Sequence, residues 1–192
     1  MSAQPAEDAR LKSFVDSVAN LRGISYVAAS SEGLPYFIAG IEKENADYVS
    51  AVANSLYDRM SELTNKLGLG DTDSIKVFLN DTTRLYVFKY KDLVLVIKYD
   101  FALDRILEKF TEMLKAAKSV ICYNCKTDLT FKIYRCPKCG SFNTYDSERC
   151  WSCGADLKLK TCPSCGKLIL PDGSKPGFFT VLIYRLKSIF SK

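Results

Sequence analysis

The 192-residue sequence predicts an α+β fold, in which an antiparallel five-stranded sheet packs with helices and a small cysteine-rich module follows. Apolar residues before residue 119 recur at helical and strand spacings, in the order helix, two strands, helix, three strands, helix. All eight Cys lie beyond residue 121. We therefore expect one domain at 1–119, a second at 120–170, and a linker with an apolar, basic tail at 171–192.

The first elements are a helix and a hairpin. Within residues 8–21, four apolar residues recur at spacings of three and four and form one helix face: Leu11, Phe14, Val15 and Val18. Gly23 ends this helix. Residues 24–30 and 34–40 are short apolar runs on either side of Ser31-Glu32-Gly33, where Gly supplies the positive φ of a tight turn. These runs predict two paired strands.

A long amphipathic helix follows. Its main seam predicts packing on the sheet and consists of Ala46, Val49, Ala53, Leu56, Met60, Leu63 and Leu67. Gly68 and Gly70 stop the helix. Tyr48, Val52 and Tyr57 lie off the seam and form a second apolar strip, which one layer of sheet would not cover. We expect this strip to face a partner subunit.

Three further strands are predicted at residues 74–80, 84–90 and 93–99. Because the links between them are short, neighbouring strands should pair antiparallel. Asp100 is expected to cap a last helix over residues 101–118. The packing face of that helix is Leu103, Ile106, Leu107, Phe110, Met113 and Leu114.

This element order, with the Gly33-Leu34-Pro35 turn, the long second helix and the Gly68-Leu69-Gly70 exit, resembles the roadblock/dynein-light-chain family over about residues 8–118. The similar longin fold shares the layered plan. The roadblock resemblance implies a domain without a catalytic centre. It also implies a homodimer through the helix around Ala46–Leu67 and a sheet edge, and a platform that regulates Ras-like small GTPases or serves as a motor or scaffold adaptor.

The residues themselves disfavour an enzyme. The chain has no His, so the commonest general base is missing. Gly68-x-Gly70 lacks the third glycine and the preceding strand of a phosphate-binding loop, and Asp71 and Asp73 are typical turn residues. We expect no catalytic and no cofactor-binding residue.

The cysteines form four Cys-x-x-Cys pairs, which are Cys122/Cys125, Cys136/Cys139, Cys150/Cys153 and Cys162/Cys165. Two intervening residues let a tight turn point both sulfurs at one ion, and two such turns complete a tetrahedral zinc site. Gly follows the second Cys in three pairs, and Lys126 takes that place in the first. Residues 122–165 resemble double zinc ribbons, and we expect two structural zinc ions rather than disulfides or a redox centre.

The sequence allows two ways in which the four turns could share the two zinc ions. Sequential pairing joins the first pair to the second and the third to the fourth, whereas nested pairing joins the inner two and the outer two. The nested form would lay residues 129–135 against 155–160, and the β-prone run at 130–134 favours it. The ligand list is the same in both, and neither site keeps a position for water.

The charge of residues 120–192 argues against a strongly basic surface for binding nucleic acid. Residues 120–192 carry 12 Lys+Arg against 5 Asp+Glu, a net +7 that falls to +3 once eight thiolates hold two zinc ions. Three aromatic residues near Lys138 and Arg149 are suited to base stacking, namely Phe142, Tyr145 and Trp151. Small zinc ribbons, however, more often pack such rings around the metal turns. A nucleic-acid-associated zinc-ribbon protein is therefore the alternative function.

The tail suits a basic amphipathic helix, built from Phe178, Phe179, Val181, Leu182, Leu186, Ile189 and Phe190 with Arg185, Lys187 and Lys192. Such a helix lies on a membrane, in a partner groove, or on the protein's own sheet or dimer, and the sequence does not decide among them. No apolar stretch is long enough to span a bilayer, and the first ten residues contain no apolar signal core. We expect a cytoplasmic protein.

Overall fold

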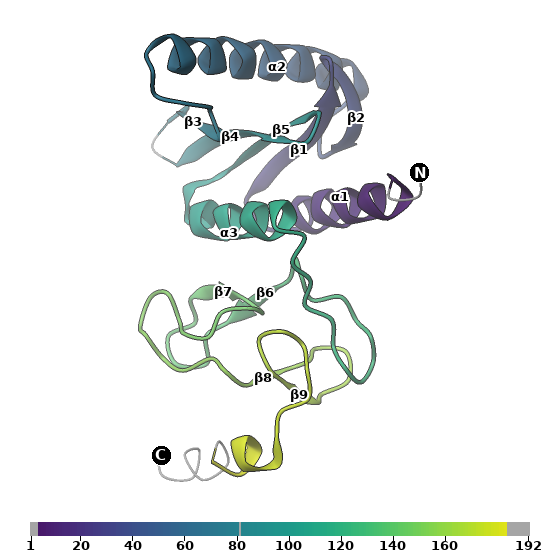
Figure 1. The fold of residues 1–192 in the computed structure, drawn as a ribbon, viewed down its shortest axis with the longest axis vertical. Coiled ribbons are helices and arrows are strands. Elements are labelled where there is room, and N and C mark those ends of the chain that lie inside the picture. Colours follow the sequence, from purple (N-terminus) through teal and green to yellow (C-terminus); the bar gives the residue numbers. More distant parts are fainter. Residues whose placement is uncertain (1–3, 81, 184–192) are drawn as a thin grey trace. The chain divides into compact units, whose positions relative to one another are not determined.

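The computed structural model describes residues 4–80 and 82–183 (Figure 1). The chain divides into two compact units, Met1–Leu107 and Glu108–Lys192. This division falls within the helix Asp104–Lys115. The domain boundaries expected at 119/120 and 170/171 remain predictions.

The first unit contains a five-stranded sheet in the order β2-β1-β5-β4-β3, with every neighbouring pair antiparallel. The strands are β1 Ile24–Ser31, β2 Leu34–Ala39, β3 Ser74–Phe78, β4 Thr83–Tyr90 and β5 Leu93–Asp100. The predicted fold class and the antiparallel pairing are confirmed. Strands β2 and β3 are the two edges of the sheet.

Helices cover both faces of this sheet (Figure 1). Helix α2, Lys43–Lys66, crosses one face, and helix α1, Gln4–Ala19, lies on the other. After β5 comes a 3₁₀ turn, η1 Phe101–Leu103, and then helix α3, Asp104–Lys115. The side chain of Asp100 accepts a hydrogen bond from the Ala102 amide, so the predicted cap exists but caps the 3₁₀ turn.

The β1–β2 hairpin has a two-residue turn, because Ser31 pairs directly with Leu34. Glu32 and Gly33 occupy the turn with φ of 51° and 82°. Two successive positive φ angles match the right-handed twist of the flanking strands. Glu32 and Gly33, which the sequence placed in the turn, therefore determine the geometry of this hairpin.

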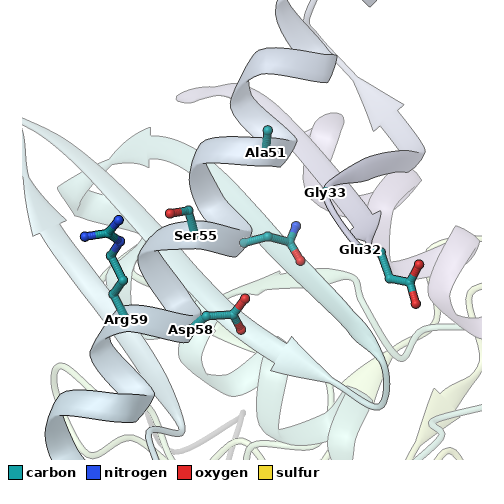
Figure 2. A pocket seen from close by; sticks show the side chains of 7 residues that line it. Glu32, Gly33, Ala51, Ser55, Asp58 and Arg59 are labelled. Carbon is teal, nitrogen blue, oxygen red and sulfur yellow. The ribbon is translucent and has the colours of Figure 1, made fainter.

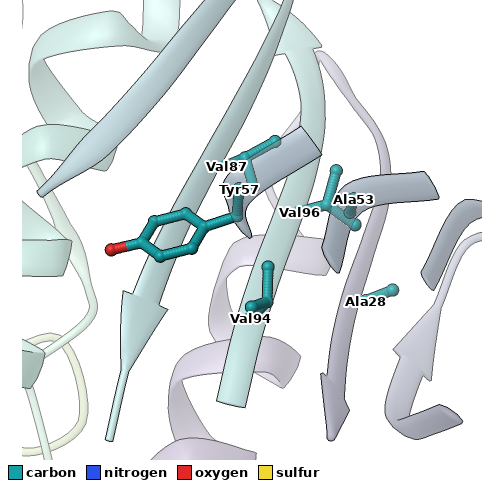
Figure 3. Packing of buried hydrophobic residues seen from close by; sticks show 6 residues of the cluster. All are labelled: Ala28, Ala53, Tyr57, Val87, Val94 and Val96. Carbon is teal, nitrogen blue, oxygen red and sulfur yellow. The ribbon is translucent and has the colours of Figure 1, made fainter. Parts of the chain in front are cut away.

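Two apolar layers hold the sheet. On the α2 side, Figure 3 shows a cluster of Ala28, Ala53, Tyr57, Val87, Val94 and Val96. Strand neighbours point to opposite faces, so Phe88, next to Val87, packs on the α1 side against Phe14, with ring centroids 6.1 Å apart. All four residues predicted for the α1 face and all six predicted for the α3 face are buried.

The prediction that Tyr57 belongs to a partner-facing strip is wrong. Its side chain is only 7% exposed, and its hydroxyl donates to the Thr72 carbonyl. Leu63 and Leu67, predicted to pack on the sheet, are exposed instead. A 24-residue helix is about 36 Å long, whereas five strands span about 20 Å. The last turns of α2 therefore extend beyond the sheet that would cover them.

Element ends differ slightly from prediction. Strand β3 ends at Phe78 instead of residue 80, and α3 ends at Lys115 instead of 118. Ala117 has a φ of 51°, which interrupts helical geometry. The predicted stop of α2 is confirmed, since Gly68 has a φ of 70° and the next amide, of Leu69, donates to the Thr64 carbonyl.

Residues 178–183 of the predicted tail helix are helical, and its remainder, 184–192, lies outside the described residues, as does Asp81 of the predicted β3–β4 link. Within the described ranges, none of the helices combines the length and the apolar character that crossing a bilayer requires.

Candidate metal centres

Four hairpin turns, each formed by one Cys-x-x-Cys pair, organise the second unit. Strands β6, Ile133–Arg135, and β7, Phe142–Thr144, flank the second pair, while β8, Lys160–Thr161, and β9, Leu168–Ile169, flank the fourth. Single antiparallel bridges, Ile121 to Asp128 and Arg149 to Asp156, flank the first and third pairs in the same way. Each pair therefore lies at the tip of its own small hairpin.

The same backbone bonds recur in all four turns. The amide of the first Cys donates to the carbonyl five residues later, as Cys122 does to Thr127 at 3.0 Å and Cys150 to Ala155 at 2.8 Å. The amide four residues later donates back to the carbonyl of the first Cys, as Gly140 does to Cys136 at 2.9 Å. These bonds hold both sulfurs of a pair on one side of the turn.

The residue after the second Cys has a left-handed conformation in every turn. Gly140, Gly154 and Gly166 have φ of 74°, 69° and 70°, and Lys126 has a φ of 59°. For a residue with a Cβ atom, this conformation is about 1–2 kcal/mol less favourable than it is for Gly. Lys126, which stands where the other three turns have Gly, therefore has a strained backbone.

Lys126→Gly should stabilise the metal-binding unit by about 0.5–1 kcal/mol, because the relief of strain exceeds the added freedom of Gly in the unfolded chain. Thermal unfolding of the zinc-loaded protein measures this. Lys138→Gly is the matched control: Lys138 is also exposed and also lies in a metal turn, but has no positive φ, so this change should destabilise. Equal losses in both variants would contradict the strain argument.

The eight sulfurs gather in two groups of four, and within each group they lie within 4.8 Å of one another. One group is Cys136, Cys139, Cys150 and Cys153, and the other is Cys122, Cys125, Cys162 and Cys165. This is the nested pairing. The strand contact expected with it is wrong, because β6 pairs with β7 rather than with residues 155–160. Pairing across a single turn closes a much shorter loop, which costs less entropy.

The sulfur separations fit zinc. Neighbouring Sγ atoms are 3.7 Å apart in Cys122/Cys165 and Cys125/Cys162, 3.8 Å in Cys136/Cys153, and 3.6 Å in Cys139/Cys150. A tetrahedral site with Zn–S bonds of about 2.3 Å places its sulfurs about 3.8 Å apart. A disulfide needs about 2.05 Å, and all eight cysteines are free. The donor set and spacing thus fit two zinc ions with four sulfurs each.

Neighbouring groups favour thiolates at some of these positions. The Thr127 side chain, with Oγ1 3.1 Å from Sγ, and the Thr127 backbone lower the pKa of Cys125 to about 6. A backbone hydrogen bond from Cys153 is the main reason that the pKa of Cys150 falls to about 6. Burial and the neighbouring sulfurs raise the pKa of Cys162 to about 11. Each group thus contains at least one position that favours the thiolate, and zinc binding would release the protons of the remaining thiols.

A buried amide positions the inner group, and sequence reasoning missed it. Asn143 donates to Cys150 Sγ at 3.6 Å and to the Ser141 carbonyl at 3.0 Å, and its oxygen accepts from the Trp151 amide at 3.0 Å. Asn143 thereby links the second turn to the third. Outer-shell bonds of this kind orient metal ligands. Nothing in the spacing of the cysteines points to this residue.

Two buried charged residues were missed as well. Lys160 donates to the Ser147 and Leu157 carbonyls at 2.5 and 2.6 Å, and burial lowers its pKa to about 8. Asp146 lies 3.0 Å from the Lys118 ammonium. Burial raises the pKa of Asp146, but hydrogen bonds from Thr144 and Lys118 and the nearby Lys charges outweigh it, so its pKa lies below the usual value. The hydrogen bonds and ion pairs of these buried residues therefore help to stabilise a unit whose apolar core is small.

The three aromatic residues considered for base stacking are not a set of exposed rings. Tyr145 is buried and packs edge-to-face on Tyr134, with ring centroids 5.5 Å apart. Phe142 is partly buried, and the Arg135 guanidinium covers its ring at 4.7 Å. Trp151 is also partly buried. Tyr145 therefore follows the packing typical of small ribbons, in which the ring belongs to the core and is not available for base stacking.

The first unit has a hollow between the β1–β2 turn and α2 (Figure 2), lined by Glu32, Gly33, Ala51, Asn54, Ser55, Asp58 and Arg59. The Asn54 amide is engaged there, donating to Ser30 Oγ at 2.6 Å and to the Ser50 carbonyl at 2.9 Å. These partly buried hydrogen bonds attach α2 to β1. The hollow adjoins the outer side of α2.

Comparison with known proteins gave matches to both parts of the chain. Residues 136–175 match the family described as "Double zinc ribbon". No curated protein matches. A roadblock/LC7 domain from Streptomyces avermitilis is 23% identical, covering 53% of this chain and 88% of its own, with a TM-score of 0.48. Myxococcus xanthus MglB is 16% identical, covering 60% of this chain and 97% of its own, with a TM-score of 0.46.

Proposed function

We propose that this chain is a non-enzymatic cytoplasmic adaptor, which forms a homodimer and regulates or anchors a Ras-like small GTPase. The observation that carries the proposal is an exposed apolar surface shared by α2 and the edge strand β2. In a soluble monomer, a surface of this kind typically marks a protein-binding site. The roadblock resemblance of the sequence supplies the class of partner.

The outer side of α2 changes character along its length. In its first half, Tyr48 and Val52 are 73% and 47% exposed, and the small residues Ala51 and Ser55 lie beside them. In its second half, the same side carries Arg59, Glu62 and Lys66, which are exposed and charged, beside the exposed Leu63. Small and apolar residues allow two helices to approach closely. The first half of α2 is therefore the proposed centre of the dimer contact.

Strand β2 extends this surface. Leu34, Tyr36 and Ile38 are exposed on it, Leu34 by 72%. Ile38 pairs with Ala28, a member of the cluster under α2, so Ile38 lies on the α2 face of the sheet. An edge strand also offers unpaired backbone groups to a neighbouring chain. A second copy of the chain would cover the helix strip and the strand together.

The two metal centres support a binding role rather than catalysis. We propose all eight cysteines as zinc ligands, and four sulfurs complete the coordination of each ion. A catalytic zinc needs a free position for water or substrate. The ribbon then serves as a rigid module that contacts a second partner or fixes the location of the dimer.

The test is calorimetric titration with a Ras-like GTPase identified by pull-down, loaded with GDP or with a non-hydrolysable GTP analogue. We expect binding that prefers one nucleotide state, and no GTP hydrolysis by the chain alone, because the first unit offers a surface without a phosphate loop. Oligonucleotides should bind weakly and lose affinity steeply with salt. Tight, sequence-selective oligonucleotide binding without GTPase affinity would overturn the adaptor proposal.

A further inference from the structure

The two metal centres close chain segments of different length. The inner centre consists of Cys136, Cys139, Cys150 and Cys153, and the outer centre of Cys122, Cys125, Cys162 and Cys165. Across the inner centre, Cys139 and Cys150 are 11 positions apart, whereas Cys125 and Cys162 of the outer centre are 37 positions apart. Closing a longer loop costs more entropy, which weakens the outer centre about six-fold relative to the inner one.

Side-chain contacts join the two halves of the inner centre. Asn143, in the second hairpin, donates to Cys150 Sγ and accepts from the Trp151 amide in the third hairpin. Cys136 and Cys150 also pack with Leu157 in one apolar cluster. Every residue in these contacts lies between positions 136 and 157, outside the first and fourth hairpins. We therefore expect the inner centre to remain folded when the outer centre opens.

The outer centre holds the last hairpin against the first. Next to its sulfurs, the Tyr123 amide donates to the Gly173 carbonyl at 2.9 Å. Gly173 is buried, and a Cβ atom at this position would lie 2.2 Å from the Ile121 carbonyl oxygen. The two ends of the metal-binding unit therefore meet at a closure, which the outer sulfurs and this backbone contact form together.

We propose that the outer centre is releasable: it loses zinc before the inner centre does. Gly173 and the last hairpin then separate from the first hairpin, while the second and third hairpins stay folded. The converse loss affects both centres, because without the inner closure the chain path between Cys125 and Cys162 is longer. The outer centre is thus the point at which zinc availability controls the conformation of this unit.

This proposal rests on the eight proposed zinc ligands, but not on the dimer or on a GTPase. Exposure of the thiols alone predicts the opposite order of release. Both Cys139 and Cys153 of the inner centre are exposed, whereas in the outer centre Cys125 is exposed and Cys165 only partly so. The order of release therefore separates loop closure from simple accessibility.

The experiment treats the full, zinc-loaded chain with excess EDTA, in the presence of N-ethylmaleimide, which labels each thiol as its zinc leaves. Mass spectrometry locates the labels. We expect Cys125 and Cys165 to be labelled about six-fold faster than Cys139 and Cys153, or more. Two zinc ions at the start with equal or reversed labelling would overturn the order of release alone. A chain that starts without zinc would overturn the ligand assignment and this proposal with it.

Gly173→Ala tests the closure without changing a ligand. Its Cβ atom would collide with the Ile121 carbonyl, and Gly173 has a φ of 83°, which Ala disfavours. The outer thiols should therefore be labelled about five-fold faster or more, and the inner thiols at the wild-type rate. Gly177→Ala is the matched control, because its Cβ atom would approach no closer than 3.8 Å to Thr180 Oγ1, and it should behave like the wild type.

Trp151 provides an independent readout of the inner centre, since it is the only Trp of the chain and lies in the Cys150/Cys153 turn. Its fluorescence should stay constant while the outer thiols are labelled and change with the inner ones. Faster labelling of both centres in Gly173→Ala, or of neither, would overturn the proposed closure.

Discussion

Cys136→Ser should unfold the metal-binding unit and leave the five-stranded sheet folded. Cys136 is buried and belongs with Leu157 to the small apolar cluster of the ribbon, so the change removes a ligand and disturbs the core beside it. Zinc binding at a structural site contributes about 10–16 kcal/mol at neutral pH, which is comparable to the whole stability of a typical small domain. No Cys lies before residue 122, so the sheet has no metal to lose.

Elemental analysis of the wild type should give two zinc ions per chain, and Cys136→Ser should lose the inner ion. Far-ultraviolet circular dichroism should retain the signal of the sheet and helices, while sites in the ribbon become accessible to protease. Ser152→Ala is the matched control, because Ser152 is exposed within the Cys150/Cys153 turn and contributes no sulfur. A wild-type protein without zinc and with oxidised thiols would contradict the two metal centres.

Val52→Asp should convert a dimer into a folded monomer. Val52 is half-exposed in the single chain, so a carboxylate there remains in water and costs the monomer little. In a dimer centred on the first half of α2, the same carboxylate would be buried without a partner, which costs several kcal/mol on each side. Light scattering should show the mass of one chain, with unchanged circular dichroism.

Glu62→Gln is the control for that change, because it alters charge on the same side of α2 but in the polar half. It should leave the dimer intact, with at most the small loss of the 2.5 Å Lys66–Glu62 ion pair on an exposed surface. A wild type that is monomeric at micromolar concentration, or a Val52→Asp variant that remains dimeric, would reject the platform formed by α2 and β2.

The sequence by itself determined the features that depend on neighbouring residues. The spacing of Leu11, Phe14 and Val18 was enough to predict α1 and its buried face, and Gly33 marked the hairpin turn. The Cys-x-x-Cys spacing predicted four metal turns, since two intervening residues already place both sulfurs of a pair together. In each case the periodicity or the turn chemistry lies within a few residues of the chain.

Only the tertiary structure decided which pairs share a site, because Cys122 and Cys165 are 43 positions apart and no local rule joins them. It also decided that Tyr57 packs on its own sheet while Leu67 does not, since the reach of α2 over the sheet depends on five strands together. Asn143 and Tyr145 became core residues of the ribbon for a similar reason. Local sequence sets which side of an element is apolar, but burial depends on where distant elements end, and this is a property of the assembled fold.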